Sequence, residues 1–226
     1  MSKVCIQAGH KNMTTGSTGA PGERDWTTKI MPMVASRLKA KGITVYETDA
    51  FGNDDSKVTG TDWDLFISIH YDADVYKDRG GFTDCPDASI DYVHTRSKEL
   101  AKKISDVFFP KMGIPVKNRS NANTRFYYMW QFLTANTPCV IIECGVGYRQ
   151  PEDYNVLRRY DEVATALSDA ISSALGVTGG CEAKLALLEE SIVAKDKEIT
   201  TLKAKVDELV KISAKWDQVK KLVSGK

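Results

Sequence analysis

The chain has 226 residues and nearly balanced charge, with 31 Lys and Arg against 30 Asp and Glu. This length accommodates one α/β domain with a sizeable core plus a smaller appendage. The charge balance gives no reason to expect a nucleic-acid partner, and no stretch is apolar for long enough to predict a membrane partner. The first residues show no secretory apolar segment, which predicts synthesis in the cytoplasm without a signal peptide.

The cysteines indicate reduced thiols. They are odd in number, widely spaced and without a CxxC pair: Cys5, Cys85, Cys139, Cys144 and Cys181. We therefore expect mostly buried, reduced side chains, and no disulfide framework.

Apolar runs and polar loops alternate over the first half of the chain, which is typical of an α/β fold. Val4–Ala8 and Ile43–Thr48 are rich in apolar and β-branched residues and predict strands, the first of which ends in a Gly-His turn. Between them, residues 23–41 carry apolar side chains at helical spacing and predict one amphipathic helix. After a polar loop at 49–62, the apolar run Leu65–Ile69 predicts a strand buried on both faces, and this strand ends at a histidine.

The same alternation continues to residue 175. Residues 89–109 predict a second long helix, and the aromatic segment 123–136 predicts a partly helical connection. Pro138–Glu143 predicts a second buried strand, which ends in a carboxylate. Residues 151–175 predict one final helix.

The last part of the chain has a different pattern. Residues 176–180, Gly-Val-Thr-Gly-Gly, predict a linker between a folded domain over 1–175 and a tail over 181–226. The tail has a heptad pattern of apolar residues, with Lys195 at one polar position of the seam: Leu188, Ile192, Ile199, Leu202, Val206 and Leu209. A helix with such a stripe is not stable alone in water, so we expect a coiled coil that forms a homo-oligomer.

Four polar residues stand where the predicted strands end and the first helix begins: His10, Glu23, His70 and Glu143. Ligands of open α/β sheets bind beyond the carboxyl ends of the strands. Two imidazoles and one carboxylate are a donor set of catalytic zinc, and a second carboxylate can carry the proton of an attacking water. Taken singly, His10 could be a loop residue and Glu23 a carboxylate that favours a helix start. Taken together, the four residues favour a metal site.

These residues carry a resemblance to a known family. Gly9-His10, Glu23 at a helix start, Ser68-Ile69-His70 after an apolar run, and Pro138-Cys-Val-Ile-Ile-Glu143 resemble the zinc-dependent N-acetylmuramoyl-L-alanine amidases of bacterial autolysins and phage endolysins. The resemblance spans residues 3–175.

The resemblance implies a twisted, mixed six-stranded sheet flanked by helices. It also implies one Zn²⁺ per chain bound by His10, Glu23 and His70, with Glu143 as the catalytic carboxylate. The substrate would be peptidoglycan, cleaved at the amide that joins the muramic lactyl group to L-alanine of the stem peptide. Two departures concern loop shape and stem-peptide preference: Lys11-Asn12 replace two glycines, and Cys144–Tyr148 replace the usual segment after the glutamate.

Other residues offer weaker candidates for chemistry. Cys144 with His70 would be a nucleophile and base, but nothing nearby predicts a low thiol pKa. His94 is expected to be a solvated helix residue. An aromatic cluster predicts core packing, although aromatic faces also suit sugars: Tyr127, Tyr128, Trp130 and Phe132. Loop residues could rim a groove for an anionic glycopeptide: Arg119, Asn121, Asn123 and Arg125.

The predicted role is a phage or prophage endolysin that is made in the host cytoplasm and acts on the cell wall after release. A zinc peptidase acting on cell-wall peptides is an alternative that would use the same ligands. A non-catalytic wall-binding scaffold built on the coiled coil is an alternative from another class, and zinc content would distinguish it from an enzyme.

Overall fold

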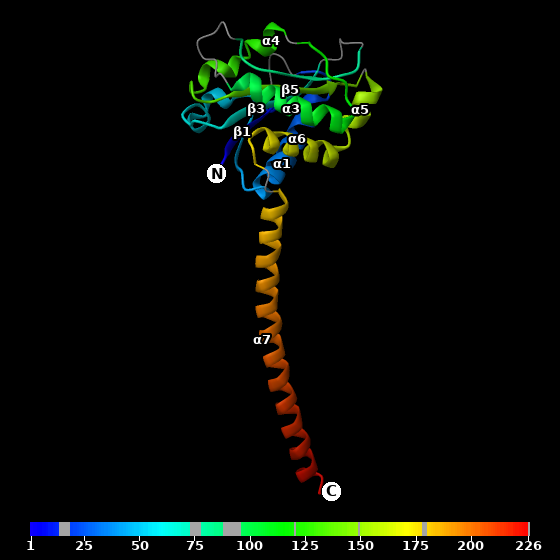
Figure 1. Cartoon of the computed structure of the whole chain (residues 1–226). Helices are drawn as coiled ribbons and strands as arrows, with labels where there is room; N and C mark the ends of the chain where they lie inside the picture. Colours follow the sequence, from blue (N-terminus) through cyan, green and yellow to red (C-terminus); the bar gives the residue numbers. More distant parts are fainter. Residues whose placement is uncertain are drawn as a thin grey trace. The chain divides into compact units, whose positions relative to one another are not determined.

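The computed structural model describes residues 1–13, 19–72, 78–87, 96–119, 121–148, 150–177 and 180–225. The chain forms two compact units, Met1–Gly180 and Cys181–Lys226 (Figure 1). In chain order the elements are β1 (Lys3–Ala8), α1 (Glu23–Ala40), β2 (Thr44–Thr48), the 3₁₀ turn η1 (Gly52–Asp54), α2 (Ser56–Thr59), β3 (Leu65–Asp72), β4 (Phe82–Asp84), α3 (Ser97–Met112), α4 (Ala122–Arg125), the 3₁₀ turn η2 (Tyr128–Phe132), β5 (Cys139–Val146), α5 (Pro151–Leu157), α6 (Tyr160–Ala174) and α7 (Gly180–Val223).

The first unit is built on a mixed sheet with strand order β2-β1-β3-β5-β4. The first four strands of that order run parallel, and β4 pairs antiparallel with β5 at the edge. The predicted α/β class with a mixed sheet flanked by helices is therefore confirmed.

The sheet has five strands in the described part of the chain, one fewer than the resemblance implies. A further pairing beside β4 is reduced to an isolated bridge between Gly81 and Val116. There Gly81 donates its N–H to the Pro115 carbonyl, and Lys117 donates its N–H to the Gly81 carbonyl. Because Pro115 has no N–H, it cannot donate a further ladder hydrogen bond.

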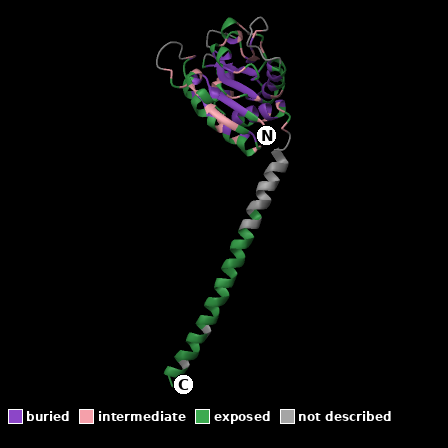
Figure 2. Cartoon of the chain, turned by 90° about the vertical axis from the view of Figure 1, so that its left-hand side faces the viewer, coloured by how far each residue is buried: buried purple, intermediate pink, exposed green. Residues whose placement is uncertain are grey.

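Side chains alternate between the two faces of the sheet, as the period of two requires. Ile6, Ile67 and Ile142 point to the face covered by α1, α3 and α6, where the larger core lies. Phe66 and Ile141 point to the opposite face and join a smaller core around η2 and α2. Figure 1 shows the three long helices on one side of the sheet and α4 on the other, and Figure 2 shows the buried strands between them.

The two candidate site residues on strands, His70 and Glu143, lie on the less covered face, opposite the three long helices. Ser68 and His70 follow Phe66 at even spacing, and Glu143 follows Ile141 by two. His70 and Glu143 are directly paired in the parallel register of β3 and β5. The prediction that both strands end at these residues is wrong, because pairing resumes after a β-bulge and extends β3 and β5 to Asp72 and Val146.

Three other predicted boundaries change. The predicted loop at 49–62 contains η1 and α2. Of the helix predicted over 89–109, residues 89–95 lie outside the described ranges, and α3 extends past the prediction to Met112, where Gly113 (φ 64°) caps it. The single final helix is wrong, because α5 ends at Leu157. The indole N–H of Trp26 donates to the Leu157 carbonyl at 2.8 Å, so the buried α1 side chain satisfies that carbonyl at the break.

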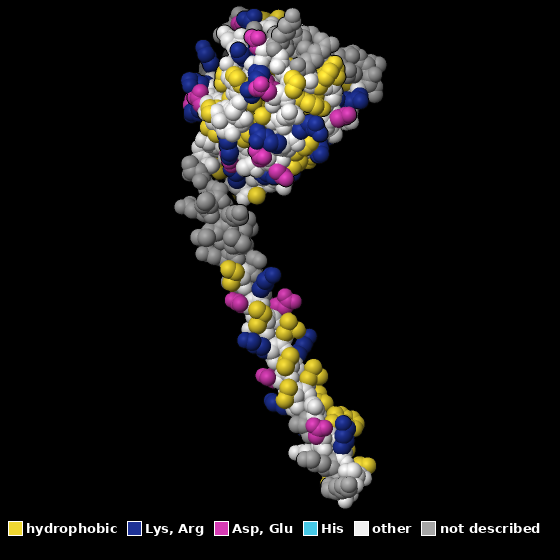
Figure 3. All heavy atoms as spheres, turned by 90° about the vertical axis from the view of Figure 1, so that its right-hand side faces the viewer, with side chains coloured by type: hydrophobic (Ala, Val, Ile, Leu, Met, Phe, Trp, Pro, Cys, Tyr) yellow, Lys and Arg dark blue, Asp and Glu magenta, His cyan; other side chains and the backbone are white. Residues whose placement is uncertain are grey.

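The second unit is the helix α7, which extends the predicted tail helix back to Gly180. Its apolar stripe is exposed along the described side chains, from Ile192 (58 %) through Leu202 (53 %) to Val219 (45 %) (Figures 2 and 3). Among the described residues, no helix combines the length and apolar character needed to cross a bilayer.

Candidate metal and catalytic site

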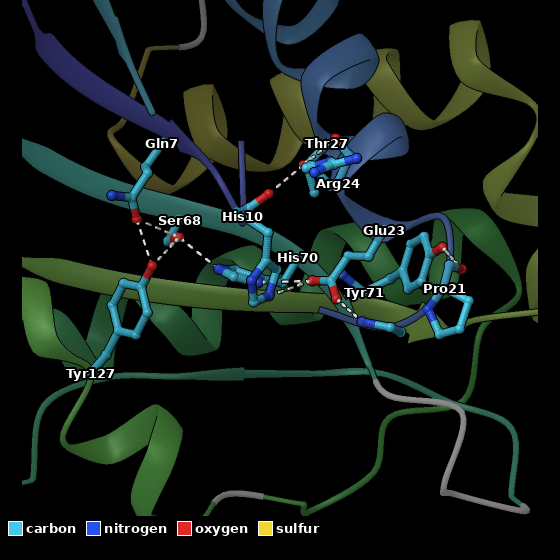
Figure 4. Close-up of polar contacts among 12 residues, drawn as sticks. Gln7, His10, Pro21, Glu23, Arg24, Thr27, Ser68, His70, Tyr71 and Tyr127 are labelled. Carbon is cyan, nitrogen blue, oxygen red and sulfur yellow. Dashed lines mark hydrogen bonds and ion pairs between the residues drawn. The ribbon is translucent and has the colours of Figure 1, made fainter. Parts of the chain in front are cut away.

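The structure brings together the three predicted metal ligands. His10, Glu23 and His70 each offer one ligand atom, and these atoms lie within 4.8 Å of one another. Glu23 Oε1 is 2.8 Å from His70 Nδ1 and 3.5 Å from His10 Nε2. The two imidazole rings meet edge to face, with their centroids 4.9 Å apart. In Figure 4 the Glu23 carboxylate points at both rings, although the three residues come from a turn, a helix start and a strand.

The Gly9-His10 turn places the first histidine. His10 adopts the left-handed region (φ 58°), which is unfavourable for a residue with a Cβ and is tolerated where the surroundings impose it. Gly9 donates its N–H to the Ile69 carbonyl at 3.0 Å, which ties the turn to β3. A Cβ on Gly9 would collide with the His70 ring, so glycine is required for the two histidines to approach.

Glu23 is the first residue of α1 and is 3 % exposed. Its Oε2 accepts a hydrogen bond from Ala20 N–H at 2.8 Å, and its Oε1 accepts one from Tyr71 N–H at 3.3 Å. The hydroxyl of Thr27, one turn later, donates to the Gly9 carbonyl at 2.5 Å. These contacts fix the carboxylate and join α1 to the turn that carries His10.

Glu143 stands apart from the three ligands in its hydrogen bonding. Its Oε2 is shielded from solvent and has no hydrogen-bond partner among the described residues. Burial raises the pKa of Glu143 well above its usual range, and repulsion from Glu23 and Asp72 adds to the effect. A shielded carboxylate oxygen without a partner costs stability, which is typical of a group that takes part in chemistry.

All four residues line one pocket of about 660 Å³. Its other walls come from the segment after His10, the loop after β2, the end of β3, the strands β4 and β5, and the α4–η2 region: Met13, Gly19, Ala20, Pro21, Ala50, Tyr71, Asp72, Phe82, Asn121, Asn123, Thr124, Tyr127, Tyr128 and Ile141. The pocket has room for a peptide-sized group beside the ligand cluster.

A donor set of two imidazole nitrogens and one carboxylate at these separations fits a catalytic zinc ion. The ring nitrogens that face Glu23 are Nδ1 of His70 and Nε2 of His10. The outer nitrogen of His70 contacts Ser68 Oγ at 3.0 Å, which is the outer-shell contact that metal-bound histidines usually make. The residues present therefore fit such a metal.

Sequence reasoning missed a buried polar cluster behind His70. Gln7 and Ser68 are fully buried on adjacent strands, and both contact the Tyr127 hydroxyl. A glutamine inside the apolar run of β1 was a signal that could have revealed this cluster, since a buried amide needs partners. Asp72 was also missed. It forms an ion pair with Arg119 at 3.0 Å beside the pocket.

The structure decides several weaker candidates. Cys144 points to the helix-covered face, opposite His70. Burial raises its thiol pKa well above the usual range, so the nucleophile hypothesis is wrong. The four described cysteines are free: Cys5, Cys85, Cys139 and Cys144. His94 lies outside the described residues.

The predicted aromatic cluster and the predicted polar loop each contain residues with different surroundings. Trp130 is buried core, whereas Tyr128 is 36 % exposed on the pocket wall. Arg119 is nearly buried and contacts carbonyls of residues 78–80, so it does not rim a groove. Asn121 and Asn123 do line the pocket, as predicted.

Comparison with known proteins identifies the family. The N-acetylmuramoyl-L-alanine amidase family matches residues 4–175. The chain belongs to this family. The predicted resemblance is thereby confirmed, and with it peptidoglycan amidase activity as the function class of residues 4–175, which we call the amidase domain. A search of curated proteins gave no match.

Solved structures share the fold of the amidase domain. The catalytic domain of CwlV from Bacillus (Paenibacillus) polymyxa var. colistinus is 21% identical, with a TM-score of 0.60, over 79% of this chain and 100% of that one. An N-acetylmuramoyl-L-alanine amidase from Clostridium difficile 630 is also 21% identical, with a TM-score of 0.60, over 79% and 98%. The catalytic domain of the CD27L endolysin, which targets Clostridia difficile, is 19% identical, with a TM-score of 0.59, over 76% and 98%.

Proposed function

We propose that the amidase domain binds one zinc ion through His10, Glu23 and His70. It would then hydrolyse the amide between the lactyl group of N-acetylmuramic acid and L-alanine of the stem peptide. The observation that carries this proposal is the convergence of the three ligand atoms within 4.8 Å, in the same pocket as a carboxylate oxygen without a partner. Membership of the amidase family supports the choice of bond.

When bound, zinc supplies a Lewis acid that acidifies water and polarises a carbonyl. Glu143 Oε2 takes a proton from the attacking water and returns it to the leaving amine of L-alanine. The raised pKa of Glu143 suits both steps, because a base that must also act as an acid works best near the operating pH. Repulsion from the nearby Glu23 carboxylate adds to the burial that keeps the Glu143 pKa high.

The pocket walls would hold the stem peptide and orient its first amide. Asn123 is exposed on the wall formed by α4, and its amide can both donate to and accept from a peptide backbone. Asn121 is held by its role as the cap of α4, where its side chain accepts from the Asn123 N–H at 2.8 Å. Preference for particular stem peptides would therefore depend on α4 and on segments 11–12 and 144–148, where the sequence differs from the usual family pattern.

The cellular role that we propose is that of an endolysin, which reaches the cell wall after release from the cell in which it is made. The shared fold with the CD27L endolysin domain supports this role. The exposed apolar stripe of α7 supports homo-oligomerisation through a coiled coil. An oligomer would present several amidase domains to one wall polymer and raise its avidity without a separate wall-binding module.

The test combines metal content with product chemistry. The purified chain should contain about one zinc per chain, and digestion of peptidoglycan should release free L-alanine N-termini that disappear on chelation. New D-amino-acid termini without L-alanine termini would identify a zinc peptidase instead. Wall binding without any new terminus, in a protein that holds no zinc, would identify a scaffold and refute the enzyme.

A further inference from the structure

A chain of buried hydrogen bonds leads from Gln7 to the outer nitrogen of His70. Gln7 and Ser68 are register partners on β1 and β3, and both are fully buried. Ser68 Oγ lies 2.9 Å from Gln7 Oε1 and 3.0 Å from His70 Nε2. The Tyr127 hydroxyl lies 2.8 Å from the same Gln7 Oε1. Figure 4 shows these groups on the side of His70 away from Glu23.

The backbone carbonyl of Asp49 determines the direction of the hydrogen bonds in this buried series. Gln7 Nε2 lies 2.9 Å from the backbone carbonyl of Asp49, which can only accept. The amide nitrogen of Gln7 must therefore face Asp49, and its oxygen must face Ser68 and Tyr127. Because Gln7 Oε1 can only accept, both hydroxyls donate to it.

This direction fixes the hydrogen on His70. Ser68 has a single hydroxyl hydrogen, and because that hydrogen goes to Gln7 Oε1, it is not available to His70. Ser68 Oγ therefore accepts from His70 Nε2–H. In a neutral imidazole, Nδ1 then carries the lone pair.

The Nδ1 lone pair of His70 faces Glu23 Oε1 at 2.8 Å. Two acceptors do not approach this closely unless positive charge lies between them, either as a metal ion or as a proton on Nδ1. The series of buried hydrogen bonds thus leaves the Nδ1 lone pair of His70 available to bind a cation. The Glu23 carboxylate offers a second ligand atom on the same side of the ring.

We propose that Gln7 and Ser68 are positioning residues that hold His70 with its hydrogen on Nε2, so that Nδ1 is the zinc ligand. Tyr127 belongs to the same cluster but is not on the path, because the Asp49 carbonyl orients Gln7 without it. This inference rests on the proposed zinc site and adds to it the atom that binds and the residues that select that atom.

The first experiment reads the atoms directly. The chain has three histidines, so selective ¹⁵N-histidine labelling of the full-length, zinc-loaded protein gives a simple spectrum in which a His70→Gln variant assigns His70. We expect a metal-bound Nδ1 and a protonated Nε2 on His70. Zinc on Nε2 of His70 would overturn the inference while leaving the proposed zinc enzyme intact.

The second experiment measures zinc affinity by chelator competition. Loss of an outer-shell partner typically weakens metal binding 10–100-fold, so we expect a loss of about this size in Ser68→Ala and recovery in Ser68→Thr, which restores the hydroxyl. Gln7→Met keeps side-chain length, frees the Ser68 hydrogen and should also weaken binding. It serves as the test if Ser68→Ala does not fold. Tyr127→Phe is the matched control and should leave both the His70 spectrum and zinc affinity unchanged.

The outcomes separate the two proposals. Wild-type zinc affinity in folded Ser68→Ala and Gln7→Met would overturn the positioning role alone. Weakening by Tyr127→Phe equal to that by Ser68→Ala would also overturn it, since the cluster would then act only through packing. If the wild-type chain binds no zinc at all, the proposed zinc-dependent function is refuted, and the positioning role, which rests on it, is refuted with it.

Discussion

Replacement of Glu143 by glutamine should lower activity and raise stability in the same variant. Glutamine keeps the shape of the side chain but can neither take nor return a proton. General acid–base catalysis contributes roughly 10²–10⁴-fold, so we expect the release of L-alanine N-termini to fall by about that factor. Zinc content should stay at the wild-type value, because Glu143 is not among the three clustered ligand atoms.

The stability change follows from the environment of Oε2. That oxygen is shielded and has no partner among the described residues, and burial raises the Glu143 pKa. An unsatisfied buried polar group costs about 1–3 kcal/mol. Because glutamine removes the charge but keeps a polar group, we expect a gain of about 1 kcal/mol in the metal-free protein, at the low end of that range. For an amidase domain of this size, that is a rise of roughly 2–4 °C in the unfolding midpoint.

The gain should depend on pH with a definite sign. The folded-state pKa of Glu143 lies above its unfolded value, so the cost of ionisation is absent below the unfolded carboxyl pKa of about 4.3 and grows as pH rises through the folded pKa. Thermal unfolding with chelator should therefore show wild type and Glu143→Gln converging in acid and separating at pH 8.

Glu198→Gln, an exposed carboxylate on α7, is the control for Glu143→Gln and should change neither property. Near wild-type turnover by Glu143→Gln would refute the catalytic assignment. A lower midpoint than wild type at pH 8 would refute the account of its burial.

Three further predictions concern packing, metal and tail. Trp26→Phe leaves the Leu157 carbonyl without its donor and should lower the free energy of unfolding by about 1–3 kcal/mol in thermal denaturation; an unchanged midpoint would mean that the α5–α6 break has another cause. Zinc at 100 times its dissociation constant should stabilise the chain by about 2.7 kcal/mol, and a shift of the same size in His70→Ala would contradict the ligand set. Leu202→Lys combined with Val206→Lys should reduce the mass in light scattering to one chain and lower helix content, whereas an unchanged mass would exclude this stripe as the contact.

The sequence alone determined the order of the main strands and helices and the candidate residues of the site. Apolar periodicity is a local property, so β1, α1 and β2 could be predicted close to their observed bounds. His10, Glu23, His70 and Glu143 were found because polar residues beside buried apolar runs need a reason, and the motifs around them resemble one family. The mixed α/β sheet followed from that resemblance.

Only the tertiary structure decided how those residues meet. His70 and Glu143 are neighbours because β3 and β5 pair in parallel in a register that sets the two residues opposite each other on one face. Register depends on how two strands pair, so the sequence of one strand alone does not determine it. The break after Leu157 depends on the indole of Trp26 from a distant helix. The hydrogen on His70 depends on a carbonyl at Asp49 and an amide at Gln7, because hydrogen-bond direction is settled by partners brought together in space.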